Sequence, residues 1–191
     1  MGKEGKSGES VVQAFEGRMV RDRPTWMRDY RAGVAVWQAS YTDFGAEKAS
    51  AIAGRAEVRL RSRLVEAEQL SRREGTQTLG SKSASSGNFV GDISNSQYLV
   101  FDRVNLDGIT RVTARVASPS TGGLIQLRKG TPGGPLISEL KFVATGGWED
   151  WQETRGDIIK DPGGLIDLCI LFVNPKDAGP FMNLDWLRFD K

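Results

Sequence analysis

Apolar and polar residues alternate along much of the chain from Gly33 onward. The segments VAVWQASYTD and RAEVRLRSRL place apolar side chains at every second position, which is the spacing of a strand with one covered face. A turn-like stretch, FGAEKASAIAG, separates them. The pattern therefore predicts a pair of β-strands within residues 33–62.

Further short apolar segments follow this pair: QYLVFDRVNL, TRVTARVAS, GLIQLRKG, ELKFVAT, GLIDLCILFVN and MNLDWLRFD. None of them has the length and period of a convincing helix. The stretches between them, such as TPGGP, KDPGG and NPKDAGP, are rich in glycine, proline and aspartate, which supply the backbone angles of tight turns. Short strands at this spacing predict an all-β fold, an antiparallel β-sandwich or jelly roll, over residues 63–191.

The first 32 residues have a different character. The composition of MGKEGKSGES predicts a flexible arm. In the next segment, SVVQAFEGRMV, Ser10 stands where an N-cap would, and the apolar residues recur at helix-compatible spacing: Val11, Val12, Phe15 and Met19. This segment predicts either a short amphipathic helix that docks on a partner surface or a frayed tail.

Composition excludes several classes of function. The chain has no histidine, which removes nucleophile pairs with an imidazole base and imidazole zinc sites. Cys169 is the only cysteine and lies in the apolar run LIDLCILFV, where we expect a buried small hydrophobe. The formal charge of +2, from 26 basic and 24 acidic residues, lacks the basic bias of a nucleic-acid binder. No apolar run approaches the roughly 18 residues of a membrane span.

The order of motifs in the second part of the chain resembles carbohydrate-binding module family 6. The motifs are VEAEQL, GNFVGDISNSQYLVFDRVNL, TARVASPSTGGLIQLR, TGGWEDWQET and GPFMNLDWLRFD, and they cover about residues 63–191. Such modules are jelly rolls appended to polysaccharide-active enzymes, and residues 33–62 resemble the strand pair that precedes them in large bacterial proteins. The resemblance implies a noncatalytic sugar-binding module of a multidomain protein, outside the cell or on its surface. The opening residues lack the apolar core of a signal peptide, so we expect any export signal to lie outside this sequence.

The resemblance also implies a sugar site between loops. It places a stacking ring at Trp148 and a hydrogen-bonding amide at Asn183, because the apolar face of a pyranose packs on an aromatic plane and amides bind its hydroxyls. Where the family has Gly-Tyr-Ile, with a second ring, this chain reads Gly91-Asp92-Ile93. Asp92 cannot stack, so it either hydrogen-bonds a sugar hydroxyl or marks a retired cleft. Trp148 has the alternative role of rim packing.

VEAEQL and the end of the last strand imply a structural calcium site made of Glu66, Glu68 and Asp190. A spacing of two places Glu66 and Glu68 on the same face of a strand. Calcium takes about six to eight oxygen ligands, so backbone carbonyls would complete the shell. The alternative is a solvated acidic edge.

Two other functions are weighed against sugar binding. The sandwich could be a building block of a homo-oligomer, with residues 1–32 docked on a neighbouring subunit. Catalysis by paired carboxylates needs two groups roughly 5 to 10 Å apart, and nothing in the sequence fixes such a pair. The sequence therefore predicts a binding module first, an assembly protein second, and no enzyme.

Overall fold

The computed structural model describes residues 18–20, 34–42 and 53–191, with side chains from residue 62 onward. These residues fall into two units, one with strands β1–β3 and one that runs from Arg61 to Lys191. In the first unit, β1 (Arg18–Val20), β2 (Val34–Thr42) and β3 (Ala53–Arg61) form a sheet in the order β1-β2-β3. The strand pair expected within residues 33–62 thus corresponds to β2 and β3, with β1 as a third strand.

β1 corrects one sequence prediction. The sequence predicts either the end of a short helix or a frayed tail at Arg18–Val20, but these residues are extended and pair antiparallel with β2, so that Met19 lies opposite Trp37. Ladder hydrogen bonds to a neighbouring strand outweigh a helical spacing of apolar residues over so short a segment. The remainder of the predicted helix and the MGKEGKSGES arm lie outside the described residues.

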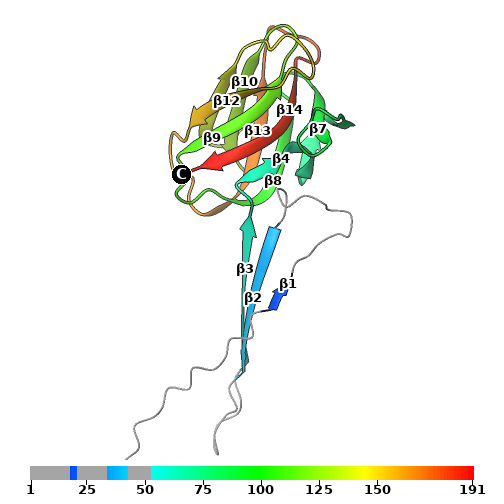
Figure 1. The fold of residues 1–191 in the computed structure, drawn as a ribbon. Coiled ribbons are helices and arrows are strands. Elements are labelled where there is room, and N and C mark those ends of the chain that lie inside the picture. Colours follow the sequence, from blue (N-terminus) through cyan, green and yellow to red (C-terminus); the bar gives the residue numbers. More distant parts are fainter. Residues whose placement is uncertain (1–17, 21–33, 43–52) are drawn as a thin grey trace, which may run out of the picture. The chain divides into compact units, whose positions relative to one another are not determined.

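The second unit is a β-sandwich of antiparallel strands, which confirms the predicted fold class (Figure 1). One sheet has the order β11-β10-β13-β8-β5 and the other β12-β9-β14-β7-β6, with β4 paired to β14. The bounds are β4 Leu64–Glu66, β5 Arg72–Glu74, β6 Gln77–Gly80, β7 Asn88–Ile93, β8 Tyr98–Asn105, β9 Arg111–Ala117, β10 Gly123–Lys129, β11 Leu136–Phe142, β12 Gln152–Asp157, β13 Leu165–Val173 and β14 Met182–Asp190. A short 3-10 helix, η2, covers Ala67–Gln69.

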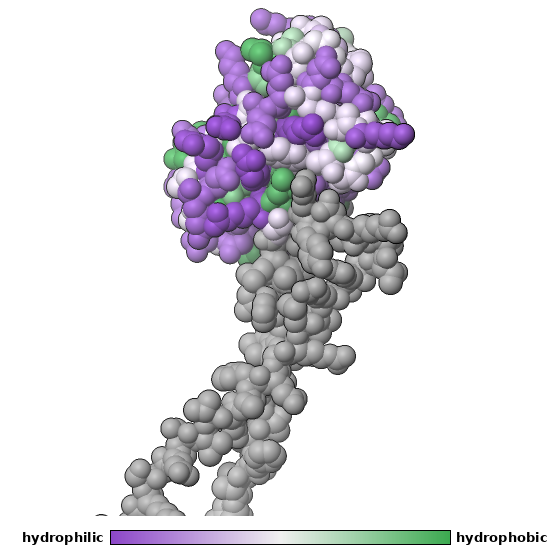
Figure 2. All heavy atoms as spheres, in the orientation of Figure 1, coloured by the Kyte–Doolittle hydropathy of each residue, from purple (hydrophilic) through white to green (hydrophobic). Residues whose placement is uncertain are grey.

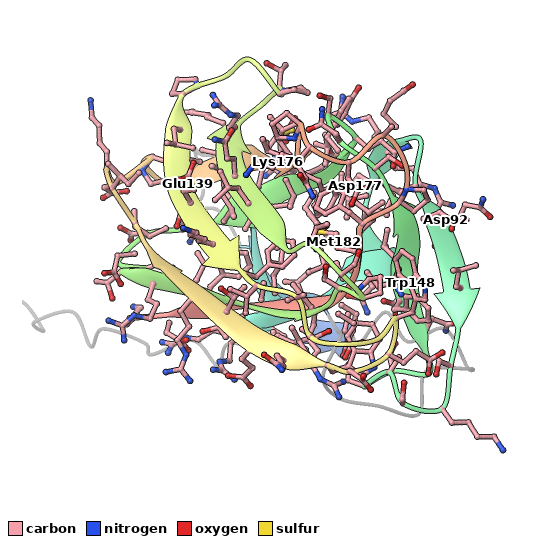
Figure 3. The ribbon with its side chains drawn as sticks, turned by 90° about the horizontal axis from the view of Figure 1, so that it is seen from above. Asp92, Glu139, Trp148, Lys176, Asp177 and Met182 are labelled. Carbon is pink, nitrogen blue, oxygen red and sulfur yellow. The ribbon has the colours of Figure 1, made fainter. Side chains whose placement is uncertain are left out.

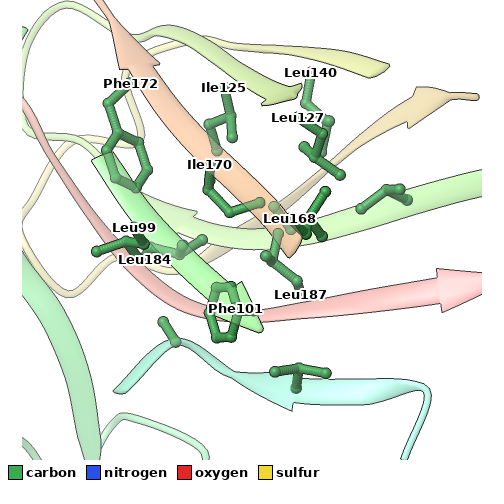
Figure 4. Packing of buried hydrophobic residues seen from close by; sticks show 14 of the residues in the cluster. Leu99, Phe101, Ile125, Leu127, Leu140, Leu168, Ile170, Phe172, Leu184 and Leu187 are labelled. Atoms are coloured by element: carbon green, nitrogen blue, oxygen red, sulfur yellow. The ribbon is translucent and has the colours of Figure 1, made fainter. Parts of the chain in front are cut away.

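The core lies between the two sheets (Figure 4). Leu184 and Leu187 of β14 meet large apolar residues of the other sheet, including Phe101 and Phe172, all at most 1% exposed. Cys169 is fully buried, as predicted, and burial raises the pKa of its thiol to about 11. On the face of the module in Figure 2, hydrophilic residues predominate and hydrophobic ones are scattered. No helix in the described part of the chain has the length and hydropathy needed to span a membrane.

Strand register places several loops at one end of the sandwich. β14 begins at Met182, which pairs with Ile93 at the end of β7, and Asn183 pairs with Ala117 at the end of β9. Four loops therefore gather at this end, which we call the loop end (Figure 1): 94–97, 118–122, 143–151 and 174–181. The turn 81–87 between β6 and β7 lies beside the middle of β14, because Ser85 bonds to Asp185.

Candidate functional site

Trp148 projects from the loop 143–151 at the loop end and is 44% exposed. Its backbone is held from two sides: Thr145 N donates to Ser118 O at 2.7 Å, and Trp148 O accepts from Asn183 Nδ2 at 2.7 Å. Gly146 has a φ of +103°, a conformation that other residues rarely adopt. The TGG segment thus forms a tight, anchored turn that leaves one large aromatic ring facing solvent.

Asn183 lies beneath this turn as the second residue of β14 and is 4% exposed. While Nδ2 binds the Trp148 carbonyl, Oδ1 faces Gly91, where an added Cβ would lie 3.0 Å from it. The same Cβ would approach Leu79 Cδ1 to 2.6 Å and Phe89 Cε2 to 3.0 Å, so a larger residue here would require these side chains to shift. No described residue donates a hydrogen bond to Asn183 Oδ1, and this oxygen is not among the fully buried atoms that lack a partner, so it is an acceptor open to solvent.

Asp92 follows Gly91 on β7 and is exposed, with a φ of +56°. Figure 3 shows Asp92 and Trp148 on the same side of the module, seen from the loop end. The Asn183 amide binds the Trp148 carbonyl and faces Gly91, the residue before Asp92. The structure therefore brings Asn183 to the backbone of Trp148 and places Asp92 on the same side of the module.

A second tryptophan, Trp151, connects the Trp148 loop to neighbouring segments. The Trp151 ring meets Phe89 edge to face at a centroid distance of 5.4 Å, and the Arg115 guanidinium lies 5.3 Å from its centroid. Trp151 Nε1 donates to Ser83 Oγ at 2.9 Å. These contacts tie the start of β12 to the turn 81–87 and give Trp151 a packing role.

Glu149 makes a further link between the same two segments. Its Oε2 accepts hydrogen bonds from Ser81 Oγ at 2.5 Å and from Ser83 Oγ at 2.7 Å. These bonds favour the ionised form and lower the pKa of the carboxyl group. The residue next to Trp148 is therefore fixed and charged at neutral pH.

An acidic cluster lies beside the middle of β14. Glu66 is 1% exposed and Asp185 is fully buried. Ser85 joins them, because its Oγ lies 2.7 Å from Glu66 Oε2 and 3.3 Å from Asp185 Oδ1, and its backbone N donates to both Asp185 oxygens at 3.1 and 3.2 Å. Arg115 forms an ion pair with Asp185 through Nη1.

Glu68, at the start of η2, completes this cluster. Its Oε1 accepts from Ser86 Oγ at 2.5 Å, whereas its buried Oε2 has no partner. Burial raises the pKa of the Glu68 carboxyl group, and the nearby Asp185 charge contributes in the same direction. The cluster thus contains a carboxylate oxygen that lacks the hydrogen bond or cation a buried oxygen requires.

The structure does not bring Asp190 to Glu66 and Glu68. Glu66 lies opposite Trp186 on β14, and Asp190 is four residues farther along, opposite Arg111, where it contacts Thr113 and Arg188. Asp185 occupies the place beside the two glutamates. With the side chains as they stand, the described residues contain no group of three or more Cys, Asp or Glu in position to hold a metal ion.

Sequence reasoning overlooked Asp185, although a signal was present. An aspartate within the apolar strand NLDWLRF must find polar partners when the strand is buried. A register shift between Leu184 and Trp186 breaks simple alternation at this point, so alternation did not indicate which face Asp185 occupies.

The family model "Carbohydrate binding module (family 6)" matches residues 66–191. The chain belongs to this family. Endo-1,4-beta-xylanase A of Thermoclostridium stercorarium is 30% identical over 106 residues, 55% of this chain and 19% of the xylanase. Arabinoxylan arabinofuranohydrolase of Paenibacillus polymyxa is 28% identical over 102 residues, 52% of this chain and 16% of the enzyme. The chain thus spans less than a fifth of each of these relatives.

Solved structures of family 6 modules share the fold. A β-1,3-glucan-binding module from Bacillus halodurans superposes with a TM-score of 0.62 and 29% identity, over 67% of this chain and 95% of that one. A module from Clostridium cellulolyticum in complex with xylose superposes with a TM-score of 0.62 and 31% sequence identity. This match covers 67% of this chain and 96% of that one. These matches confirm the resemblance and the function class of a carbohydrate-binding module, and they do not favour the assembly alternative.

Proposed function

We propose that this chain binds a glycan without catalysis, at the loop end, through Trp148, Asn183 and Asp92. The observation that carries the proposal is an exposed indole whose backbone carbonyl is fixed by a nearly buried amide. A pyranose on the indole buries its apolar C–H face, and its hydroxyls can donate to the open Oδ1 of Asn183 and to the Asp92 carboxylate.

One aromatic face and a few hydrogen bonds support only modest binding. Part of the gain is offset by lost motion of the sugar and by removal of water from its hydroxyls. We expect dissociation constants between roughly 10 μM and 1 mM for a short oligosaccharide. An anchored loop keeps the entropic cost low, because little of the protein has to be ordered on binding.

A glycan array followed by titration calorimetry tests this function. Trp148→Ala should weaken binding about tenfold or more, because it removes the stacking surface. Ile159→Ala is the matched control, because Ile159 is an apolar residue that is 65% exposed but lies away from the loop end. Ile159 is hydrogen-bonded to Ile137 near the start of β11, whereas Trp148 comes after the end of that strand. Well-folded protein that binds no glycan, or binding that Trp148→Ala leaves unchanged, would refute the loop-end site.

We propose further that Glu66, Glu68 and Asp185 hold a structural calcium ion. All three supply hard carboxylate oxygens, and the partnerless Oε2 of Glu68 is an oxygen that a cation would satisfy. Ser85 and Ser86 hydroxyls now rest on these carboxylates and can rotate away. Calcium would neutralise the cluster and brace the turn 81–87 against β14.

Thermal melting in calcium and in chelator tests the metal site. Calcium should raise the melting temperature of the parent, and Glu68→Gln should reduce that shift strongly. Asp185→Asn and Asp190→Asn form a matched pair that separates the two candidate aspartates: only the former should reduce the calcium-dependent shift. Equal melting of the parent with and without calcium would exclude a structural role for the ion.

We propose, finally, that the module works outside the cell as part of a larger polysaccharide-active protein. The support is that the curated relatives are xylan-related enzymes many times longer than the matched segment. Immunoblots of cell and medium fractions with an antibody against the module test this. A cytosolic band would contradict the proposal.

A further inference from the structure

The rim of the loop site carries negative charge. Asp92, Glu149 and Asp150 are all exposed. Glu149 and Asp150 follow Trp148 in the chain, and Asp92 lies on the same side of the module as Trp148 (Figure 3). The Asp150 carboxylate folds over the turn, so that a Cβ on Gly147 would lie 2.6 Å from its Oδ2. The exposed indole is therefore carried by a turn that also holds a carboxylate.

The positive charges of the described residues do not neutralise this rim. Neither Asp92 nor Asp150 forms an ion pair with any described residue. The Arg115 guanidinium is engaged by the buried Asp185. Lys176 lies well apart from Asp92 and Trp148 when the module is viewed from the loop end (Figure 3). Two carboxylates thus remain uncompensated beside the indole.

A second observation points to a ligand at the same place. Asn183 is 4% exposed, yet its Oδ1 accepts no hydrogen bond from the described residues and faces Gly91, next to Asp92. Among the described residues this oxygen is not one of the fully buried atoms that lack a partner, so it is open to water and to the donor groups of a ligand. Both the open acceptor and the carboxylates favour a ligand rich in N–H or O–H donors.

We infer that the loop site prefers an amino sugar, a pyranose with a protonated amine, over the N-acetylated or neutral counterpart. The inference rests on the proposed sugar-binding function and deepens it. The ammonium group would form a charge-assisted hydrogen bond with Asp92 and be attracted to the face of Trp148. A uronic acid would be repelled by the same rim. Asp92 is the residue that determines this specificity.

The size of the preference follows from the exposure of the charges. Ion pairs at exposed positions contribute little, whereas charge-assisted hydrogen bonds contribute more, so we expect about three- to tenfold tighter binding of the amino sugar. Because exposed charges are screened by salt, this preference should shrink as ionic strength rises.

Titration calorimetry with glucosamine and N-acetylglucosamine tetrasaccharides, cellotetraose and a uronic-acid oligosaccharide tests the inference, at mildly acidic pH and at two salt concentrations. Asp92→Asn is the key variant, because asparagine tolerates the positive φ and keeps the side-chain shape. It should abolish the preference for the amino sugar over its N-acetylated counterpart, because it removes the charge that the ammonium group would pair with. Asp107→Asn removes the same charge in the β8–β9 loop, away from the loop end, and should change nothing.

The outcomes separate the inference from the function on which it rests. Equal affinity for the glucosamine and N-acetylglucosamine oligosaccharides, or a preference that survives Asp92→Asn, overturns the inference and leaves the sugar-binding function standing. Absence of binding to every glycan, from folded protein, overturns both.

Discussion

Removal of the Asp185 carboxylate is expected to destabilise the sandwich strongly. In Asp185→Ala, the Arg115 guanidinium loses its ion-pair partner while its side chain stays only 26% exposed. The Ser85 backbone N–H also loses both of its acceptor oxygens. Breaking a buried pair on one side costs about 3–5 kcal/mol, because the remaining charge is left uncompensated.

The lower end of that range applies here. Arg115 keeps a hydrogen bond to Ser83 O at 3.3 Å and its position over the Trp151 ring, and water reaches part of it. We therefore expect a loss of about 3 kcal/mol in the free energy of unfolding. For a domain of this size, 1 kcal/mol corresponds to about 3–5 °C, so the melting temperature should fall by about 10–15 °C.

Guanidinium denaturation followed by tryptophan fluorescence, in chelator, measures this loss without any contribution from calcium. The matched control is Asp190→Ala: this carboxylate is 38% exposed and its contacts with Arg188 and Thr113 are both long, at 3.4 Å, so its loss should cost about 1 kcal/mol. Adding Arg115→Met to Asp185→Ala should recover part of the stability, because it removes the unpaired charge. Equal denaturation midpoints for Asp185→Ala and Asp190→Ala would refute the assignment of Asp185 as the buried partner.

Three further predictions concern single residues. Burial raises the pKa of the Glu68 carboxyl group, so at a pH just above its ordinary value of 4.5 the folded state binds more protons than the unfolded state. Without calcium, the stability of the parent should therefore fall as pH rises through that region. Melting curves of Glu68→Gln should lack this decline. Gly91→Ala should cost about 1–3 kcal/mol and weaken glycan binding, since its Cβ would press on Leu79 and Asn183; unchanged melting and affinity would contradict this packing. Cys169 should react with a thiol reagent only at the rate of unfolding, and rapid labelling of native protein would contradict its burial.

Much of the sandwich could be predicted from the sequence, because its strands alternate or are continuously apolar and its turns are rich in glycine and proline. The runs around Phe101 and Phe172 identify core strands by their apolar content alone. The strand at Arg18–Val20 could not be predicted, because three residues are too few to reveal a period and their pairing depends on a partner strand distant in the sequence.

The candidate site was less accessible to sequence reasoning. Resemblance to the family singled out Trp148 and Asn183, and alternation along the strand predicted a packing role for Trp151, which its contacts with Phe89 and Arg115 bear out. Asp185 was missed in favour of Asp190, since a register shift in β14 hides the direction of its side chain. Alternation predicts faces only where the ladder is regular.

The acidic cluster and the loop site belong to one connected network, which explains how an exposed loop can present a fixed ring. Asp185 holds Arg115, which contacts both Ser83 O and the Trp151 ring. Ser83 in turn holds Glu149, the residue next to Trp148. A binding surface built on such contacts is ordered before the ligand arrives, so the sugar need not supply the free energy to order it. For the proposed loop-end site, we therefore expect substitutions in the acidic cluster to lower both stability and glycan affinity, because both depend on the same contacts.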